Sequence, residues 1–294
     1  MKNRVLSSTL MFLFTPFVFG QTLDNPKKNR LSITETYIYP SVGLQRVPLG
    51  TLNDFRKLAP QSTILNKDLS AYSSAIFMST YGQTSFSAKL GISFLDKDKN
   101  TYKTNPTLRI GFNYFRNVGL ISQLNKTTRV RFDTLYSTTG GPPIYLDSVT
   151  HYFIGMSYGT EELRVDVSLI FRTDIEARWS IYGGMGITLG GSLNSYTDIN
   201  YSENSSIESS ATGYSINNNF YPSSSERFKN ESSIGYSMYL PMGLDFRMGN
   251  KREFWKRLHV YYEAKPYLNS SYLQQIGMFT NVGIQNGLGL RVTF

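Results

Sequence analysis

Strict alternation of apolar and polar residues constrains this chain most, and it is clearest in the segment FTNVGIQNGLGLRVTF, residues 279–294. Successive side chains of a strand point to opposite faces of a sheet. From Val282 to Phe294, one face is therefore apolar apart from Asn286, whereas the other carries glycine, Gln285, Arg291 and Thr293. The pattern predicts a β-strand with one face in an apolar medium. A strand at the edge of a soluble sheet has the same alternation.

Seven further segments are interpreted as strands, which predicts about eight strands in all. In the clearest of them, Phe86 to Leu95, apolar residues alternate with Ser, Lys and Gly. The seven segments are residues 32–44, 86–95, 108–120, 163–172, 179–189, 236–248 and 258–268. Pro241 falls inside one of them, where it requires a bulge or an imperfectly paired position.

The strand pattern leads to a membrane barrel rather than to membrane helices. After residue 20, no segment has the roughly 18 consecutive apolar residues of a membrane helix. Because unpaired backbone polar groups are unfavourable in lipid, only a closed barrel remains as a membrane-spanning structure. A hydrophobic content of 40%, with 21 Tyr and 19 Phe, fits lipid-facing strands with aromatic girdles. We expect an all-β, transmembrane, antiparallel up-and-down β-barrel of about eight strands, or ten if a hairpin over residues 129–150 enters the bilayer.

The first twenty residues have the pattern of a secretory signal peptide. Lys2 and Arg4 precede an apolar run from Val5 to Phe19, and cleavage is expected before Gln21. Residues 1–20 are thus predicted to be a signal peptide, and residues 21–294 a single barrel domain. The chain has no Cys, which excludes a lipoprotein anchor, a disulfide and a thiolate metal site. These features favour the outer membrane of a Gram-negative bacterium.

Short and long connections separate the predicted strands. The short turns are residues 96–105, 173–177 and 249–256, and the large loops are residues 47–71, 121–158 and 194–233. Short periplasmic turns and longer extracellular loops are typical of bacterial barrels. Loops of this length are usually functional or disordered, and the Tyr, Ser and Asn of residues 194–233 suit an adaptable recognition surface. The basic turn from Lys251 to Arg257 suits an acidic partner or lipid headgroups equally well.

Two sets of side chains are predicted from the register of the strands. A periplasmic aromatic girdle comprises Phe94, Phe171, Trp179, Phe246, Trp255 and Phe294. A lumen charge network comprises Glu35, Lys89, Arg109, Arg164, Asp166, Asp245, Arg247, Glu263, Lys265 and Arg291. An eight-stranded barrel is just wide enough for its side chains to fill it, and buried charges must be paired. We therefore expect a plugged lumen rather than a pore.

The remaining residues offer little for catalysis, metal binding or nucleic-acid binding. A hydrolytic triad needs a hydroxyl and a carboxylate beside a base, and the only histidines are His151 in a loop and His259 on an inner face. Two distant histidines, no Cys and no dense carboxylate cluster predict no metal site, and nothing predicts a cofactor. The net charge of +9 suits anionic lipid better than nucleic acid, because no basic helix or stacking motif accompanies it.

Two segments and the final residue carry a family resemblance. The segments are EELRVDVSLIFRTDIEARWSIYGGMGITLGG, which contains the run Tyr182-Gly183-Gly184-Met185-Gly186, and YLPMGLDFRMG. Together with Phe294 they resemble Bacteroidota outer-membrane β-barrel families, the PorT-like and OmpA-like barrel domains. The likeness covers most of residues 84–294. It implies an outer-membrane location and recognition of the final strand by the barrel-assembly machinery.

These observations predict a non-enzymatic outer-membrane barrel that is surrounded by lipid and binds envelope proteins through its loops. Members of the resembled families serve as small structural barrels or as accessory subunits of secretion or assembly machines. We expect an accessory subunit of a secretion, uptake or assembly complex. The alternatives are a lipid-modifying enzyme that uses His151 or His259, and a small diffusion pore.

Overall fold

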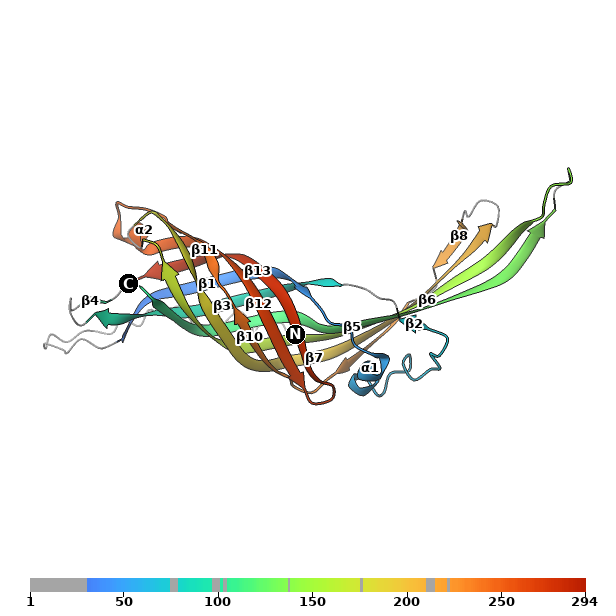
Figure 1. Cartoon of the computed structure of the whole chain (residues 1–294), viewed down its shortest axis with the longest axis horizontal. Helices are drawn as coiled ribbons and strands as arrows, with labels where there is room; N and C mark the ends of the chain where they lie inside the picture. The colour runs from blue at the N-terminus through green and yellow to red at the C-terminus, as the bar shows by residue number, and fades with distance from the viewer. Residues whose placement is uncertain are drawn as a thin grey trace, which may run out of the picture. The chain divides into compact units, whose positions relative to one another are not determined.

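A computed structural model describes residues 31–74, 79–96, 101–102, 105–136, 138–174, 177–209, 215–220 and 223–294. The predicted signal peptide, residues 1–20, lies outside these ranges. Within them, eight antiparallel strands close into a ring, which confirms the predicted fold class (Figure 1). The ring strands are β1 (Leu31–Arg46), β3 (Thr80–Asp96), β5 (Thr107–Leu135), β6 (Ile144–Arg172), β7 (Trp179–Ser209), β10 (Ile234–Tyr239) continued by β11 (Met242–Arg247), β12 (Leu258–Leu273) and β13 (Gly277–Thr293).

The ring is closed by the pairing of its first strand with its last. β1 pairs with β13 from Glu35↔Thr293 to Arg46↔Val282, and also with β3, which in turn pairs with β5. The sixth strand of the ring is divided between β10 and β11 at Leu240 and Pro241, as the sequence predicts for a strand that contains proline. The carbonyl of Pro241 still accepts from the Gly184 N–H at 3.0 Å, so the interruption is local.

The two ends of the barrel differ. At the end that holds Leu31 and Phe294, called the terminal end below, the strands are joined by residues 97–106, 173–178 and 248–257. The first of these contains β4 (Thr101–Tyr102), and the third contains α2 (Glu253–Arg257). At the opposite end, β12 and β13 are joined by a tight turn that Gly277 completes with a φ of 89°, in the region that favours glycine.

Three wall strands continue past the ring as a sheet, called the extension below. β5 and β6 pair with each other as far as Leu135↔Ile144, and β6 pairs with β7 as far as Leu146↔Ser209. The short strands β2 (Ser73–Ser74), β8 (Ser215–Phe220) and β9 (Ser224–Lys229) pair along its edges. Residues 121–158 and most of 194–233, predicted as loops, are therefore mainly strand. The 129–150 hairpin lengthens β5 and β6 and adds no strand to the ring.

Two β-bulges mark the junction between wall and extension. In β5 the register shifts between Val118 and Leu120, and in the β6–β7 pair Glu161 lies opposite Asn194 whereas Glu162 lies opposite Ser192. Each bulge inserts one extra residue into its strand. As a result, the inward-facing residues are odd-numbered before the bulge and even-numbered after it in β5, and even-numbered before and odd-numbered after it in β7. The regular alternation of apolar and polar residues that predicts the wall strands consequently ends at the two bulges.

A lid, residues 47–72, covers the inner face of the wall at the extension end. It contains α1 (Leu52–Leu58), and Thr51 caps this helix in a capping box with Asp54. The lid buries Phe55, Leu58 and Leu65 against inward residues of five wall strands, which are Leu120, Leu124, Ile154, Met156, Tyr158, Ile199, Leu273 and Phe279. Among the described residues, no helix is long and apolar enough to cross a membrane.

Candidate functional site

The barrel interior is filled by paired charges. Nine of the ten residues predicted for the lumen are at most 5% exposed, and the tenth, Arg247, is not part of the network. Arg247 lies at the end of β11, where the wall gives way to a turn, and its guanidinium donates to the Ala177 carbonyl at 3.0 Å. It forms no ion pair with any described residue. Arg247 lies two residues after the inward-facing Asp245, so its side was predicted correctly, but it lies beyond the last layer of carboxylates.

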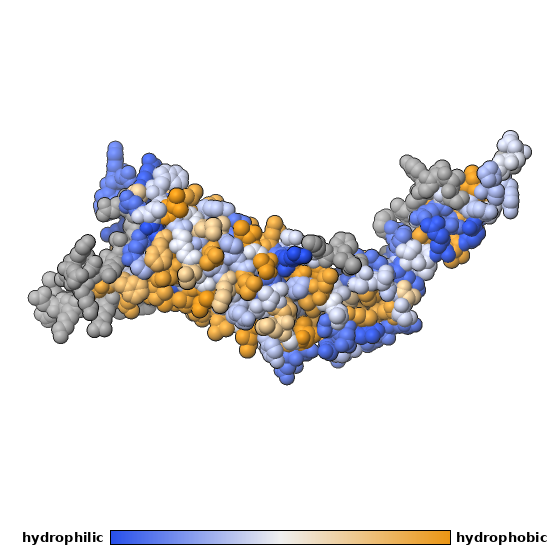
Figure 2. Space-filling model, viewed as in Figure 1, coloured by the Kyte–Doolittle hydropathy of each residue, from blue (hydrophilic) through white to orange (hydrophobic). Residues whose placement is uncertain are grey.

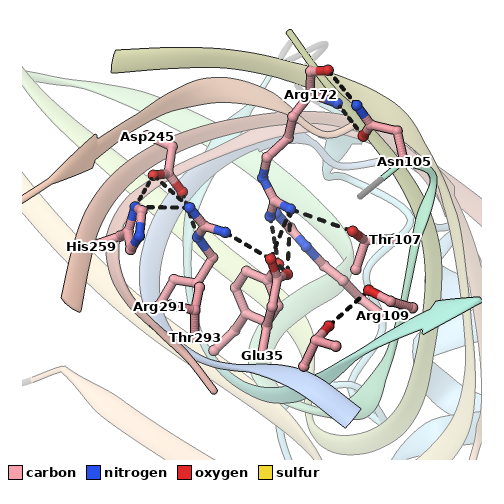
Figure 3. Close-up of polar contacts among 12 residues, drawn as sticks. Glu35, Asn105, Thr107, Arg109, Arg172, Asp245, His259, Arg291 and Thr293 are labelled. Carbon is pink, nitrogen blue, oxygen red and sulfur yellow. Dashed lines mark hydrogen bonds and ion pairs between the residues drawn. The ribbon is translucent and has the colours of Figure 1, made fainter. Parts of the chain in front are cut away.

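The layer nearest the terminal end links two carboxylates through arginines (Figure 3). Glu35 accepts from Arg291 at 2.7 Å and from Arg172 at 3.2 Å. Arg291 also reaches Asp245, with its Nε 2.8 Å from Oδ2. His259 donates from Nδ1 to Asp245 Oδ1 at 2.6 Å. The layer thus ties β1, β6, β11, β12 and β13 together across the lumen.

The next layer is centred on Glu263 of β12. Its carboxylate accepts from Arg109 at 2.7 Å, from the Tyr182 hydroxyl at 2.8 Å and from Lys265 at 3.2 Å. The Arg109 guanidinium lies 4.3 Å from the ring centre of Tyr37 and 5.0 Å from that of Tyr182. One carboxylate therefore balances two buried cations, and aromatic faces supply the remaining stabilisation.

Two more ion pairs occupy the half of the lumen toward the lid. Lys89 pairs with Asp166 at 2.8 Å, and Arg164 pairs with Glu162 at 2.5 Å. Tyr239 donates to Asp166, and there is room for its ring because Gly186 lies opposite it: a Cβ at that glycine would stand 2.3 Å from the ring. Glu162 was not in the predicted network, although it occupies an even-numbered, inward-facing position of β6 as Arg164 and Asp166 do.

Little free volume remains inside. A polar cavity of about 20 Å³ lies among Asn113, Arg164, Asp166 and Tyr239, which is room for about one water molecule. The lid closes the interior at the extension end. The described interior is therefore blocked twice, by ion-paired side chains and by an apolar plug.

Reconstitution into planar bilayers is expected to give no conductance steps above the background of the lipid. The reason is geometric, since permeation would require ion pairs buried at Glu263 and Glu35 to open together. Single-channel recording with a known porin as positive control checks this. Stable conductance steps that survive purification would contradict it.

The two histidines lie in different surroundings at opposite ends of the molecule. His151, in the extension part of β6, is 3.0 Å from the Thr127 hydroxyl, and His259 is bonded to Asp245 near the terminal end. Over the described ranges, His151 contacts a hydroxyl but no carboxylate, and His259 contacts a carboxylate but no hydroxyl. Neither assembles the three groups of a hydrolytic triad. The described part of the chain contains no group of three or more His, Cys, Asp or Glu suited to a metal ion.

The residues predicted as an aromatic girdle lie around the terminal end. Phe171, Trp179, Trp255 and Phe294 are exposed on the outside, and Phe94 and Phe246 are partly exposed. Trp179 packs on Phe246 with ring centres 4.4 Å apart. Above them the outer wall is apolar, and Figure 2 shows hydrophobic residues gathered over the barrel wall on the face in view. Exposed members in β6, β7 and β10 are Leu163, Val165, Met185, Ile187, Leu189 and Met238, and exposed Leu240 follows β10 directly.

The lid is latched to the extension by one carboxylate. Glu226 of β9 accepts from the Ser62 and Thr63 hydroxyls, each at 2.5 Å, and from the Thr63 N–H at 3.1 Å. Nearby, Asn230 donates to the Leu58 carbonyl at 2.7 Å. Partial burial by itself raises the pKa of Glu226, but the hydrogen bonds from Ser62 and Thr63 outweigh it and hold the pKa below its usual value.

We expect the latch to loosen in acid. Because the pKa of Glu226 is lowered on folding, its ionised form stabilises the latch above the usual glutamate pKa of about 4.3, and this contribution is lost as the pH falls through the lowered value. Amide-exchange protection of residues 62–66 should fall in that range. Glu226→Gln should lower the protection already at neutral pH. Asp198→Asn, which breaks the Arg227 pair on the same sheet, is the control and should leave residues 62–66 unchanged.

Comparisons with known proteins return solved structures only. No family model and no curated protein matches the chain. Neisserial surface protein A is 12% identical over 90% of this chain and 100% of its own, with a TM-score of 0.34. Ail of Yersinia pestis, in complex with the heparin analogue sucrose octasulfate, is 14% identical over 88% and 99%, with a TM-score of 0.25. The outer membrane protease OmpT of Escherichia coli is 10% identical over 91% and 99%, with a TM-score of 0.19.

Similarity at these TM-scores carries no argument about fold, ligand or activity. The fold of this chain rests on its own strand pairing, in which every wall strand has two neighbours. The resemblance to Bacteroidota families stays a prediction from the sequence.

Proposed function

We propose that this chain is an integral outer-membrane β-barrel with a closed lumen, which acts as an accessory subunit by binding an envelope protein through its extension. The membrane part of the proposal is supported by the outer wall. Water-soluble proteins rarely expose large contiguous apolar patches, whereas here exposed apolar side chains cover the outside of a ring whose inside is charged. A lipid environment suits the apolar outer surface, while the charged groups inside pair with one another.

The observation that carries the binding role is an apolar cluster at the tip of the extension, remote from the wall. Its exposed members, Val130 (65%), Phe132 (62%), Leu135, Tyr136, Ile144 and Tyr145, come from β5, from β6 and from the segment between them. Arg131 and Arg129 pair with Asp147, and Arg129 also with Glu208, so these four charges balance one another, and Asp133 adds one negative charge. The tip therefore presents mainly apolar side chains, which suits a protein partner with an apolar patch.

Short turns at the terminal end support an orientation with that end in the periplasm and the extension outside the cell. On this proposal residues 1–20 direct export, lipid surrounds the wall, and the barrel-assembly machinery recognises β13, which ends beside Phe294. A PorT-like role in a secretion machine is the specific form that the sequence resemblance suggests.

A pull-down from native membranes in mild detergent tests the binding role. With an affinity tag between β7 and β8, we expect one envelope protein to co-purify in stoichiometric amount. Phe132→Ser should remove that protein without unfolding the barrel, and Leu49→Ser, which changes an exposed apolar residue before the lid helix, should retain it. Recovery of the barrel alone from unmodified membranes would contradict the proposal.

A further inference from the structure

The turn between β11 and β12, residues 248–257, combines exposed aromatic rings with cations that the barrel interior does not use. Phe254 is 67% exposed and Trp255 41% exposed, and their ring centres lie 5.1 Å apart. Lys251, Arg252, Lys256 and Arg257 surround them. Only Lys256 has an ion-pair partner among the described residues, Glu253 at 2.8 Å, and this pairing lowers the pKa of Glu253. Within the described ranges, three cations of the turn therefore have no carboxylate as an ion-pair partner.

The turn is held in place and borders an open surface hollow. The Gly249 N–H donates to the Trp255 carbonyl at 3.1 Å, and the Met248 N–H donates to the Leu258 carbonyl at 3.0 Å. Gly249 packs so closely on Trp255 that an added Cβ would stand 2.8 Å from the tryptophan Cβ. The hollow between the two sides of the turn has a volume of about 510 Å³ and is lined by Met248, Gly249, Asn250, Lys251, Arg252 and Trp255. Its lining thus joins two cationic side chains to an apolar pair.

The position of the turn indicates which anion fits. It follows directly on the outer-wall aromatics Phe246 and Trp179, and Arg178 lies 4.9 Å from the Phe246 ring. Aromatic residues of this kind lie at the boundary between hydrocarbon and water, where phospholipid headgroups are found. A free anion would use the cations alone, whereas a lipid would also use Met248, Phe254 and Trp255.

We propose that residues 248–257 bind the phosphate headgroup of an anionic phospholipid in the leaflet around the terminal end. Lys251 and Arg252 hold the phosphate, and Trp255 contacts the lipid beside it. Each Lys or Arg close to an anionic membrane surface strengthens the attraction between protein and membrane about fivefold. Either Lys251 or Arg252 alone should therefore enrich anionic lipid around the turn measurably. The inference rests on the proposed membrane barrel. Its test distinguishes a failure of lipid binding by the turn from a failure of the barrel to insert into the membrane.

The chain provides its own reporter. It contains two tryptophans, so Trp179→Phe leaves Trp255 as the single tryptophan, whose fluorescence can be excited selectively. This variant is reconstituted in phosphatidylcholine vesicles that contain a minor fraction of phosphatidylglycerol, with bromine on the chains of one lipid or the other at equal bromine content. We expect brominated phosphatidylglycerol to quench Trp255 more than brominated phosphatidylcholine. Lys251→Gln with Arg252→Gln should make the two equal.

Matched controls decide what each outcome means. Lys57→Gln with Lys229→Gln removes the same charge at the extension end and should preserve the difference. Equal quenching in the unmodified turn, with the barrel inserted, would overturn the inference but not the barrel. Inorganic phosphate that abolishes the difference at low millimolar concentration would show a site for free phosphate rather than lipid. A protein that fails to insert, and so shows no quenching by either lipid, would overturn both proposals.

Discussion

Replacing Glu263 by glutamine is expected to lower the free energy of unfolding by about 3–5 kcal/mol, because it leaves two buried cations without their carboxylate. Glu263 is 1% exposed and bonded to Arg109, Lys265 and Tyr182. Glutamine has the same shape, so the loss comes from charge rather than from packing. Urea unfolding of the barrel in detergent or vesicles, followed by gel mobility and tryptophan fluorescence, measures it.

The matched control is Glu253→Gln, which removes the same charge from an exposed pair with Lys256. Solvent screens that pair, and little change is expected. If the two variants were equally stable, the interior would be hydrated, and the interpretation of the lumen as a closed core would be wrong.

Phe55→Ala is expected to destabilise the lid by about 3–5 kcal/mol, the usual range for removing a buried phenyl ring. Phe55 is fully buried in the apolar cluster that seals the extension end. The lid has its own small core, so its opening should not unfold the barrel. Trypsin should then cut at Arg56, Lys57 or Lys67 many-fold faster than in the unmodified protein, while the wall stays protected.

Leu49→Ala is the control for the lid, because Leu49 is half exposed. The Phe55→Ala variant also tests the two barriers to ion passage, the lid and the ion-paired layers, independently of each other. Since the ion-paired layers below it are unchanged, Phe55→Ala should remain non-conducting in planar bilayers. Channel activity on opening of the lid alone would mean that the charged layers do not block ions.

The wall could be predicted because an apolar exterior imposes a period of two. In β6, Leu163, Val165 and Phe171 face outward and Arg164 and Asp166 inward, and the alternation in the sequence carries the same information. The inward charges follow from parity in the same way. Their pairing does not, since Arg109 and Glu263 are joined by ring closure and not by any local spacing.

The extension and the lid could not be predicted from that pattern. Residues 194–209 of β7 have polar side chains on both faces, so no alternation distinguishes them from a loop. The bulges near Gly119 and Leu193 also exchange the inward-facing and outward-facing positions of their strands, and nothing in the residue composition marks where they occur. The burial of Phe55 depends on Leu273 and Phe279, more than two hundred residues later in the chain.

That separation in sequence imposes an order of assembly. The lid belongs to the connection after the first strand, yet its seat includes Leu273 and Phe279 from the last hairpin. The seat is therefore incomplete until β12 and β13 are in place and β13 has joined β1. Residues 47–72 can therefore complete their contacts only after the last hairpin has formed, although the contacting residues of β5, β6 and β7 come earlier in the chain. The seated lid consequently reports a finished barrel, and a protease directed at this segment would distinguish chains that have closed from those still open.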